Sequence, residues 1–248
     1  MSLNLFNEKK RVIVLGKGKW GKVFISCLKR KVKIIKILRS KDNYKKINCK
    51  NIDWIFVLTN TSKHDEICKY FIPKCKNIFC EKPLTFETKK TEDLIKKAKK
   101  NKCNLYISDI EKFKENKVRL KKRNIIIRKK FSNDKKDILF RYAYHDLYIL
   151  SELIDLKNFK KFNLIKNFKG ELSYSFEVKK FTFKFIYSFN SHKKIHNINK
   201  INFLLFKGNP LDRMIESILS NKENLIKNNI NALKSVYIIN KIIKKIKD

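Results

Sequence analysis

An uninterrupted apolar run followed by closely spaced glycines constrains this chain more than any other feature. Residues 12–15 are apolar, and Gly16, Gly18 and Gly21 follow in a G-x-G-x-x-G pattern. Such a run is typical of a buried parallel strand, and the three glycines allow a tight turn, close approach of a diphosphate, and helix packing on the strand. Because the chain has only five glycines, three at this spacing predict a dinucleotide-binding turn. A tight turn that binds nothing is the alternative.

The first part of the chain alternates strand-like and helix-like segments. Further strands are expected at residues 32–38, 53–58, 77–80 and 103–107, and helices at 20–30, 65–72 and 88–100. Alternation of this kind is typical of a parallel sheet with helical crossovers. We therefore expect a Rossmann dinucleotide-binding domain over residues 1–108.

The second part contains successive strand-like segments joined by short turns. Strands are expected at residues 124–128, 162–168, 172–178, 181–189 and 198–206, and helices at 138–154, 211–220 and 225–246. Short turns between strands favour a mostly antiparallel sheet. The expected fold class is thus α/β, with the Rossmann domain followed by a smaller α+β domain over residues 109–248 for substrate binding and oligomerisation.

The charge of the chain is strongly positive. It carries 61 lysine and arginine residues against 23 acidic ones, a formal net charge of +38. These basic residues are spread over nearly every segment instead of forming one tail or stripe, so solvated surfaces explain them better than a specific nucleic-acid groove. Nucleic-acid binding is therefore the weakest of three functional hypotheses.

The cysteines and histidines favour no metal site. The six cysteines form no C-x-x-C pair, and Cys27, Cys68 and Cys80 are expected to be buried thiols. His192 and His196 are four residues apart, but their lysine- and asparagine-rich surroundings predict a loop. No run of about 18 apolar residues occurs, and no basic segment precedes an apolar one at the N-terminus, so a cytoplasmic protein without a membrane span is expected.

Three short motifs occur in order along the chain. They are the glycine pattern at residues 16–21, Cys80-Glu81-Lys82-Pro83-Leu84 after an expected strand, and Tyr144-His145-Asp146-Leu147 on an expected helix. Together they resemble the glucose–fructose oxidoreductase / inositol dehydrogenase (Gfo/Idh/MocA) family. The resemblance implies an NAD(P)-dependent oxidoreductase that transfers a hydride to or from a sugar, polyol or nucleotide-sugar, with a second domain that is short for the family.

The resemblance also implies two catalytic residues. It puts Lys82 beside the nicotinamide and the reacting hydroxyl, and it makes His145 the acid/base. The chemistry needs both kinds of group, because hydride loss from a carbinol requires a base for the proton and a cation beside the developing alkoxide. An exposed surface lysine and a core histidine are the structural alternatives.

The expected cofactor is NADP, with NAD as the alternative. An NAD site usually has an acidic residue after the second strand, where this chain has Arg39-Ser40, and an arginine can pair with a 2′-phosphate. The candidate cofactor-binding residues are Gly16, Lys17, Gly18, Lys19, Trp20, Gly21, Arg39, Ser40, Thr59, Asn60, Thr61, His64, Glu81 and Lys82.

One position departs from the family pattern. The family has an aspartate one helical turn before the histidine, where this chain has Arg141. A neighbouring arginine would favour neutral His145 and could also bind an anionic substrate. The candidate substrate-binding residues are Arg141, Tyr144 and Asp146. Alternatively, the acid/base pair is broken, and the protein is a catalytically silent dinucleotide-binding protein with a regulatory or assembly role.

Overall fold

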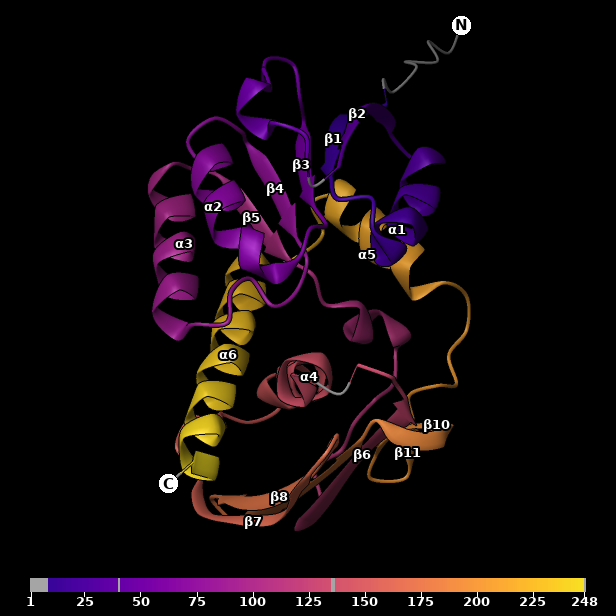
Figure 1. Ribbon diagram of the computed structural model, residues 1–248, viewed down its shortest axis with the longest axis vertical. Coiled ribbons are helices and arrows are strands. Elements are labelled where there is room, and N and C mark those ends of the chain that lie inside the picture. Colours follow the sequence, from indigo (N-terminus) through magenta and orange to yellow (C-terminus); the bar gives the residue numbers. More distant parts are fainter. Residues whose placement is uncertain (1–8, 40, 135–136, 248) are drawn as a thin grey trace, which may run out of the picture. The chain divides into compact units, whose positions relative to one another are not determined.

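The computed structural model describes residues 9–39, 41–134 and 137–247, which form two units (Figure 1). The first unit comprises the described parts of residues 1–85 together with 89–108 and 211–229. The second comprises the described parts of residues 86–88, 109–210 and 230–248. Among the described residues, no helix has the length and apolar character needed to span a membrane.

The first unit is built on a five-stranded parallel sheet in the order β2-β1-β3-β4-β5. Its strands are β1 (Arg11–Leu15), β2 (Lys33–Leu38), β3 (Trp54–Val57), β4 (Asn77–Cys80) and β5 (Asn104–Ile107). Its helices are α1 (Lys19–Lys29), the 3₁₀ helix η1 (Tyr44–Lys46), α2 (Thr61–Phe71), α3 (Thr88–Lys100) and α5 (Pro210–Leu219). The strand order and parallel pairing confirm the expected Rossmann-like sheet.

Helices cover both faces of this sheet, with α1 and α5 on one face and α2 and α3 on the other (Figure 1). All four residues of β3 are buried, which explains why it reads as a continuous apolar run. The rings of Phe24, Phe56 and Phe79 contact one another in the core, with centroids 4.9–5.7 Å apart. Arg30 of α1 binds the Asp212 carboxylate of α5 through Nη2 at 2.8 Å.

A side-chain amide covers part of one edge of the sheet. Asn228 lies in the first turns of α6 (Leu225–Lys247) and is buried. Its Oδ1 accepts a hydrogen bond from the Ile107 amide, and its Nδ2 donates one to the Ile107 carbonyl, both at 2.9 Å. The backbone polar groups of Ile107 at the edge of β5 are thereby satisfied.

The second unit contains a six-stranded sheet in the order β11-β10-β6-β9-β8-β7, in which only the β6–β9 pair is parallel among the described residues. The strands are β6 (Arg123–Phe131), β7 (Lys160–Phe168), β8 (Glu171–Val178), β9 (Phe181–Ser188), β10 (Asn190–Ile198) and β11 (Ile201–Asn202). Its other elements are the 3₁₀ helix η2 (Ile110–Lys114), the π-helical turn η3 (Leu139–Ala143), α4 (Tyr144–Ser151) and most of α6. The mostly antiparallel second sheet is confirmed.

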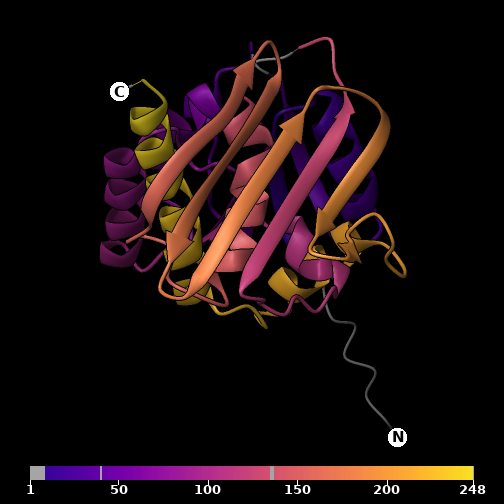
Figure 2. The same cartoon turned by 90° about the horizontal axis from the view of Figure 1, so that it is seen from below.

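The two faces of this sheet differ. Aromatic side chains fill the inner face, where Tyr174, Phe176, Phe183 and Phe185 are fully buried. Figure 2 looks onto the opposite face, and α4 lies behind the strands. On β6, the buried residues Asn124 and Ile126 alternate with exposed ones, so Ile125, which is 44% exposed, points to the outer face.

Several expected boundaries were wrong. The segment around His192 and His196 is strand β10 and not a loop, and the strand expected at 198–206 is reduced to β11. The chain turns sharply at Asn199, whose φ is +57° and whose Oδ1 accepts a hydrogen bond from the Ile125 amide. Asparagine tolerates this left-handed conformation. Helix α2 also begins at Thr61, four residues earlier than expected, and residues 138–154 are divided into η3 and α4.

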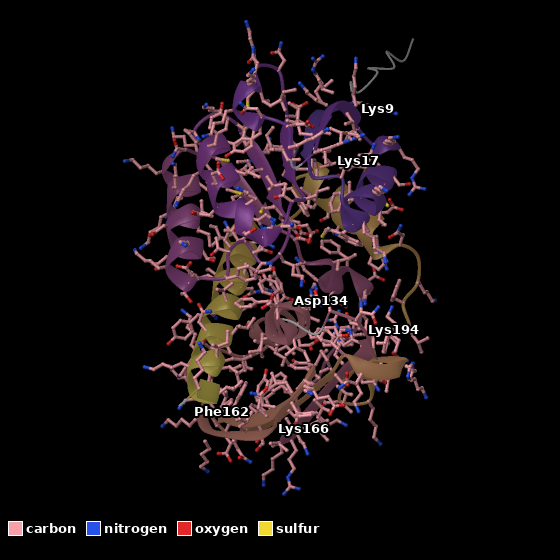
Figure 3. All side chains as sticks on the ribbon, viewed as in Figure 1. Lys9, Lys17, Asp134, Phe162, Lys166 and Lys194 are labelled. Carbon is pink, nitrogen blue, oxygen red and sulfur yellow. The ribbon has the colours of Figure 1, made fainter. Side chains whose placement is uncertain are left out.

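The cysteines are thiols and the basic side chains are dispersed. All six cysteines are free, and Cys27, Cys68 and Cys80 are buried as expected. The nitrogen ends of basic side chains point outwards on many elements of both units, including the labelled Lys9, Lys17, Lys166 and Lys194 (Figure 3). No single tail or stripe accounts for the charge among the described residues.

Candidate active site

The glycine turn between β1 and α1 leaves open space at its tip. Gly16 has φ +110°, and a Cβ atom there would collide with the Leu58 carbonyl, while a Cβ at Gly21 would collide with the Gly16 carbonyl. A Cβ at Gly18 would meet nothing within 4 Å among the described residues. Gly18 is also the N-cap of α1 and supplies no side-chain cap. The unpaired amides of this helix start can therefore bind a phosphate.

A pocket of about 690 Å³ lies at this turn in the first unit. Its lining residues are Leu15, Gly16, Lys17, Gly18, Lys22, Leu38, Arg39, Asp42, Tyr44, Leu58, Thr59, Asn60, Lys63, Glu66 and Ile67. The lining combines backbone from the carboxyl ends of three parallel strands, where ligands bind in open α/β sheets. Four of the side chains are basic and two are acidic, so the pocket favours a ligand with several phosphate charges.

Some of the expected cofactor-binding residues line this pocket, and others do not. Those in the lining are Gly16, Lys17, Gly18, Arg39, Thr59 and Asn60. Lys19, Trp20, Gly21, Thr61, His64, Glu81 and Lys82 are absent from the lining. Ser40 lies outside the described residues.

Arg39 is exposed at the end of β2. Its backbone amide donates to Oδ2 of Asp42 at 2.6 Å, and the Asp42 amide donates back to the Arg39 carbonyl at 3.0 Å. Within the described part of the chain, the Arg39 guanidinium makes no hydrogen bond or ion pair. Asp42 is therefore occupied in holding the turn, and the guanidinium remains available to an anion.

Tyr44 and Glu66 are pocket residues that the sequence analysis missed. The Tyr44 hydroxyl donates to Oε1 of Glu66, and this hydrogen bond holds the pKa of Glu66 below its usual value. Burial, followed by the same carboxylate, raises the pKa of Tyr44. Lys63 and Glu66 are three residues apart and paired at 3.6 Å on α2. Their spacing just after the Thr59-Asn60 turn was the available signal.

Thr59 contributes an unsatisfied hydroxyl to the pocket. Its Oγ1 is buried and has no hydrogen-bond partner among the described residues. Buried hydroxyls are usually hydrogen-bonded, so a ligand or a water molecule is the expected partner. Together with the open tip at Gly18, this atom indicates that the pocket fits a dinucleotide.

The segment around Lys82 is held by hydrogen bonds on both sides. The Glu81 amide donates to the Val57 carbonyl at 2.9 Å, and the Trp20 indole donates to Oε1 of Glu81 at 2.9 Å. His64 lies beside the same segment, with Nδ1 3.0 Å from the Pro83 carbonyl oxygen. Lys82 itself is half-buried.

His64 is almost completely buried, with 1% of its surface exposed. Its Nε2 lies 2.9 Å from the Thr59 carbonyl oxygen, so the ring joins two backbone segments of the first unit. Burial lowers the pKa of His64, although both carbonyls favour protonation.

In the second unit, His145 lies in the first turn of α4. Tyr144 and His145 are both buried, at 0% and 7% exposure, and their rings meet edge to face at 6.1 Å. The π-helical turn η3 ends at Ala143, directly before them. Such turns are frequent at functional sites, and this one changes the α-helical spacing on which the sequence argument relied.

Arg141 contacts the segment before η3. Its Nη1 donates to the Asp134 carbonyl at 2.7 Å and lies 3.3 Å from the Asp134 carboxylate. Its Nη2 donates to the Ser132 hydroxyl at 3.3 Å, and the guanidinium lies 4.6 Å from the centre of the Phe189 ring. These contacts occupy much of the guanidinium's hydrogen-bonding capacity.

Asp146 lies in a buried charged cluster of the second unit. Its Oδ1 is 2.7 Å from Nε2 of His196, and Nη1 of Arg128 is 3.9 Å away. Nη2 of Arg128 donates to Oε1 of Glu111 at 3.0 Å, and Nδ1 of His196 lies 3.6 Å from Oε2 of Glu111. His196 was considered only as a weak metal ligand, because its segment was expected to be a loop.

Residues 37–108 match the family described as the oxidoreductase family with an NAD-binding Rossmann fold (GFO_IDH_MocA). No curated protein matches the sequence. The NAD-binding oxidoreductase character therefore rests on this segment.

Solved structures share the fold. UDP-N-acetylglucosamine 3-dehydrogenase from Acidithiobacillus ferrooxidans has a TM-score of 0.82 and 12% identity, over 94% of this chain and 96% of that one. The dehydrogenase MviM from Clostridium difficile has a TM-score of 0.77 and 14% identity, over 95% and 99%. The WlbA dehydrogenase from Bordetella pertussis, solved with NADH and UDP-GlcNAcA, has a TM-score of 0.72 and 10% identity, over 97% of each chain. The resemblance to the Gfo/Idh/MocA oxidoreductases that the three motifs predicted is confirmed.

Proposed function

We propose that this protein is an NAD(P)-dependent oxidoreductase that transfers a hydride to or from a sugar, a polyol or a nucleotide-sugar. The main support is the pocket of about 690 Å³ at the glycine turn, whose unit also holds the Lys82 segment in a hydrogen-bonded arrangement. Two similar structures are a UDP-sugar dehydrogenase and a dehydrogenase solved with NADH and a UDP-sugar. Their substrates guide the choice of compounds for testing.

We propose that the dinucleotide binds with its diphosphate at Gly18 and the start of α1. The open space at Gly18, the uncapped helix start and the buried Thr59 hydroxyl fit such a ligand. NADP is the preferred form in this proposal, because the Arg39 guanidinium is exposed and makes no hydrogen bond within the described residues. A charged hydrogen bond to a 2′-phosphate would use it.

We propose separate roles for Lys82 and His145. When bound, the dinucleotide supplies or accepts the hydride at its nicotinamide ring. Lys82 stabilises the developing alkoxide charge of the substrate, and His145 accepts or returns the hydroxyl proton. Arg141, Tyr144 and Asp146 remain proposed substrate-site residues, of which Asp146 would act indirectly because its carboxylate is buried against His196.

A specific observation favours a second candidate function. Arg141 stands where the family has an aspartate, and it is hydrogen-bonded to Asp134 and Ser132. If no carboxylate supports His145, the protein binds dinucleotide without turning it over and has a regulatory or assembly role. In that case, the wild type oxidises no sugar, whereas Arg141→Asp restores a measurable trace of activity.

We also propose that the protein forms a homo-oligomer through the outer face of the second sheet (Figure 2). Ile125, Phe131 and Phe168 on its strands are 44%, 52% and 60% exposed. Exposed apolar side chains on one sheet face favour association. Sedimentation equilibrium of the wild type and of Ile125→Lys tests this, and a monomeric wild type would contradict it.

One experiment tests the main proposal directly. Purified protein is assayed for bound dinucleotide by mass spectrometry and then for reduction of NADP⁺ and NAD⁺, followed near 340 nm. The substrates are UDP-sugars, free hexoses and inositols. Dinucleotide-dependent oxidation of any of these supports the proposal, and tight dinucleotide binding without oxidation supports the second candidate.

A further inference from the structure

Lys82 lies between two residues that are each hydrogen-bonded to an element next to the dinucleotide pocket. On one side, the Glu81 carboxylate accepts a hydrogen bond from Nε1 of Trp20, in the first turn of α1, at 2.9 Å. On the other side, the Pro83 carbonyl lies 3.0 Å from Nδ1 of His64 on α2. These two contacts are independent, because they come from different helices.

Both contacts connect the Lys82 segment to turns that line the pocket. Trp20 directly follows the Gly18-Lys19 turn, and Gly18 lines the pocket. The second nitrogen of His64 lies 2.9 Å from the carbonyl of Thr59, which also lines the pocket. A ligand that orders these two turns therefore also restrains the residues on both sides of Lys82.

The two contacts differ in their exposure to water. His64 is 1% exposed, so water does not compete for its hydrogen bond and the low local dielectric strengthens the bond. Trp20 is 40% exposed, so water competes with the Glu81 carboxylate for its indole N–H. We therefore expect His64 to hold its segment more firmly than Trp20 does.

We infer that Trp20 and His64 are positioning residues that couple occupation of the dinucleotide pocket to the placement of Lys82. The inference rests on the proposed function, in which the Lys82 ammonium acts on the substrate. Neither side chain takes part in proton or hydride transfer. Their contribution is geometric, and a displacement of about 1 Å at a catalytic group can cost about 100-fold in rate.

Two variants and a matched control test the inference in the full-length protein. Trp20→Phe keeps the aromatic ring and removes the N–H that reaches Glu81, and His64→Leu removes both contacts of His64. Trp54→Phe is the control, because it makes the same change in β3, away from the pocket lining. NADP⁺ and the active sugar found for the wild type are the probes of turnover, and NADPH is the probe of binding.

Each variant should lower kcat by about tenfold or more while the Kd for NADPH changes by less than about threefold. The deuterium isotope effect on kcat with the sugar deuterated at the oxidised carbon should rise, because hydride transfer becomes slower relative to product release. The control should remain within about twofold of wild type. A kcat retained within about twofold in Trp20→Phe and His64→Leu would overturn the inference.

A second measurement does not require turnover. Hydrogen–deuterium exchange of peptides covering residues 81–85 should slow when NADPH binds to the wild type, and this protection should shrink in both variants but not in the control. Equal protection in all four proteins would overturn the coupling. If the wild type shows the protection but oxidises no sugar, the proposed function fails and the coupling stands. If His64→Leu does not fold, the surface variant Trp20→Phe decides the outcome.

Discussion

Oδ1 of Asp146 and Nε2 of His196 lie 2.7 Å apart in the interior of the second unit, where Asp146 is fully buried and His196 is 2% exposed. Asp146 follows the candidate acid/base His145 directly in α4, and His196 lies on β10. The pair therefore fixes the rotation of α4 against the sheet. A buried charge needs such a partner, since removing it leaves the other group desolvated.

We predict that Asp146→Ala lowers the free energy of unfolding by about 3–5 kcal/mol, the usual cost of removing one partner from a buried charged group, because Arg128 and His196 both lose this carboxylate. Urea denaturation measures the effect. Asp155→Ala is the matched control, because Asp155 is exposed and lies 3.4 Å from Lys234 in the same unit. It should cost less than about 1 kcal/mol. Equal losses in the two variants would contradict the role given to Asp146.

Acid stability should depend on Glu111. Burial opposes ionisation of Glu111, but Arg128, His196 and Lys114 outweigh it and hold the pKa of Glu111 below its usual value. A lowered folded-state pKa means that the stabilisation is complete above the unfolded value of about 4.3 and is lost as the pH falls through the folded-state value. Glu111→Gln should therefore flatten the loss of stability below about pH 4.3.

Urea unfolding of Glu111→Gln at a series of acidic pH values measures this slope. Glu115→Gln is the control, since Glu115 is an exposed glutamate of the same unit. Its profile should match that of the wild type. An unchanged acid slope in Glu111→Gln would show that other carboxylates determine acid unfolding.

Arg39 should select the cofactor. A charged hydrogen bond to a 2′-phosphate contributes about 1.5–3 kcal/mol, which corresponds to a preference for NADPH over NADH of roughly tenfold or more. Arg39→Asp should remove or reverse this preference, as measured by the two dissociation constants. Lys41→Asp makes a similar charge change at an exposed residue outside the pocket lining and should preserve it. Comparable wild-type affinities for NADH and NADPH would contradict the prediction.

Lys82→Met and His145→Asn should each suppress turnover while the protein still folds and binds dinucleotide. A general base contributes about 10² to 10⁴-fold, so a loss of less than about tenfold at His145 is too small for that role. Steady-state kinetics and NADPH titration measure the two effects. The controls are Lys99→Met and His192→Asn at exposed positions, which should leave both parameters unchanged.

The Rossmann part of the fold could be predicted from the sequence because its signals are local. The run before Gly16 and the strands β3, β4 and β5 are mostly buried, and their apolar residues show this in the sequence itself. Helix α3 begins and ends at the expected residues 88 and 100. Continuous burial on both faces makes these strands easy to recognise.

Strand β10 could not be predicted in the same way. Lys193 and Lys194 are exposed, and a register shift separates Asn190 from Ile195 in its pairing with β6. The alternation of apolar and polar residues is therefore interrupted. The strand forms because β6 supplies hydrogen bonds along it, which is a long-range effect that the local composition does not contain.

The site was predicted only in part, for a related reason. Glycines and strand ends identify the turn that lines the pocket. Tyr44 and Glu66 also line it, but they are 22 residues apart in the sequence and meet only in the folded chain. Similarly, the i,i+4 spacing suggested that Arg141 faces His145, but the intervening π-helical turn and the contacts with Asp134 were not visible in the pattern.

The amide of Asn228 has a consequence for association between copies of the chain. A strand from another molecule that extended the first sheet at β5 would need the amide and carbonyl of Ile107, and both are already bound. At the opposite edge, the exposed ammonium groups of Lys33 and Lys36 on β2 would have to approach a second strand. One edge is thus chemically occupied and the other electrostatically repulsive, which directs any self-association away from β-sheet extension in this unit.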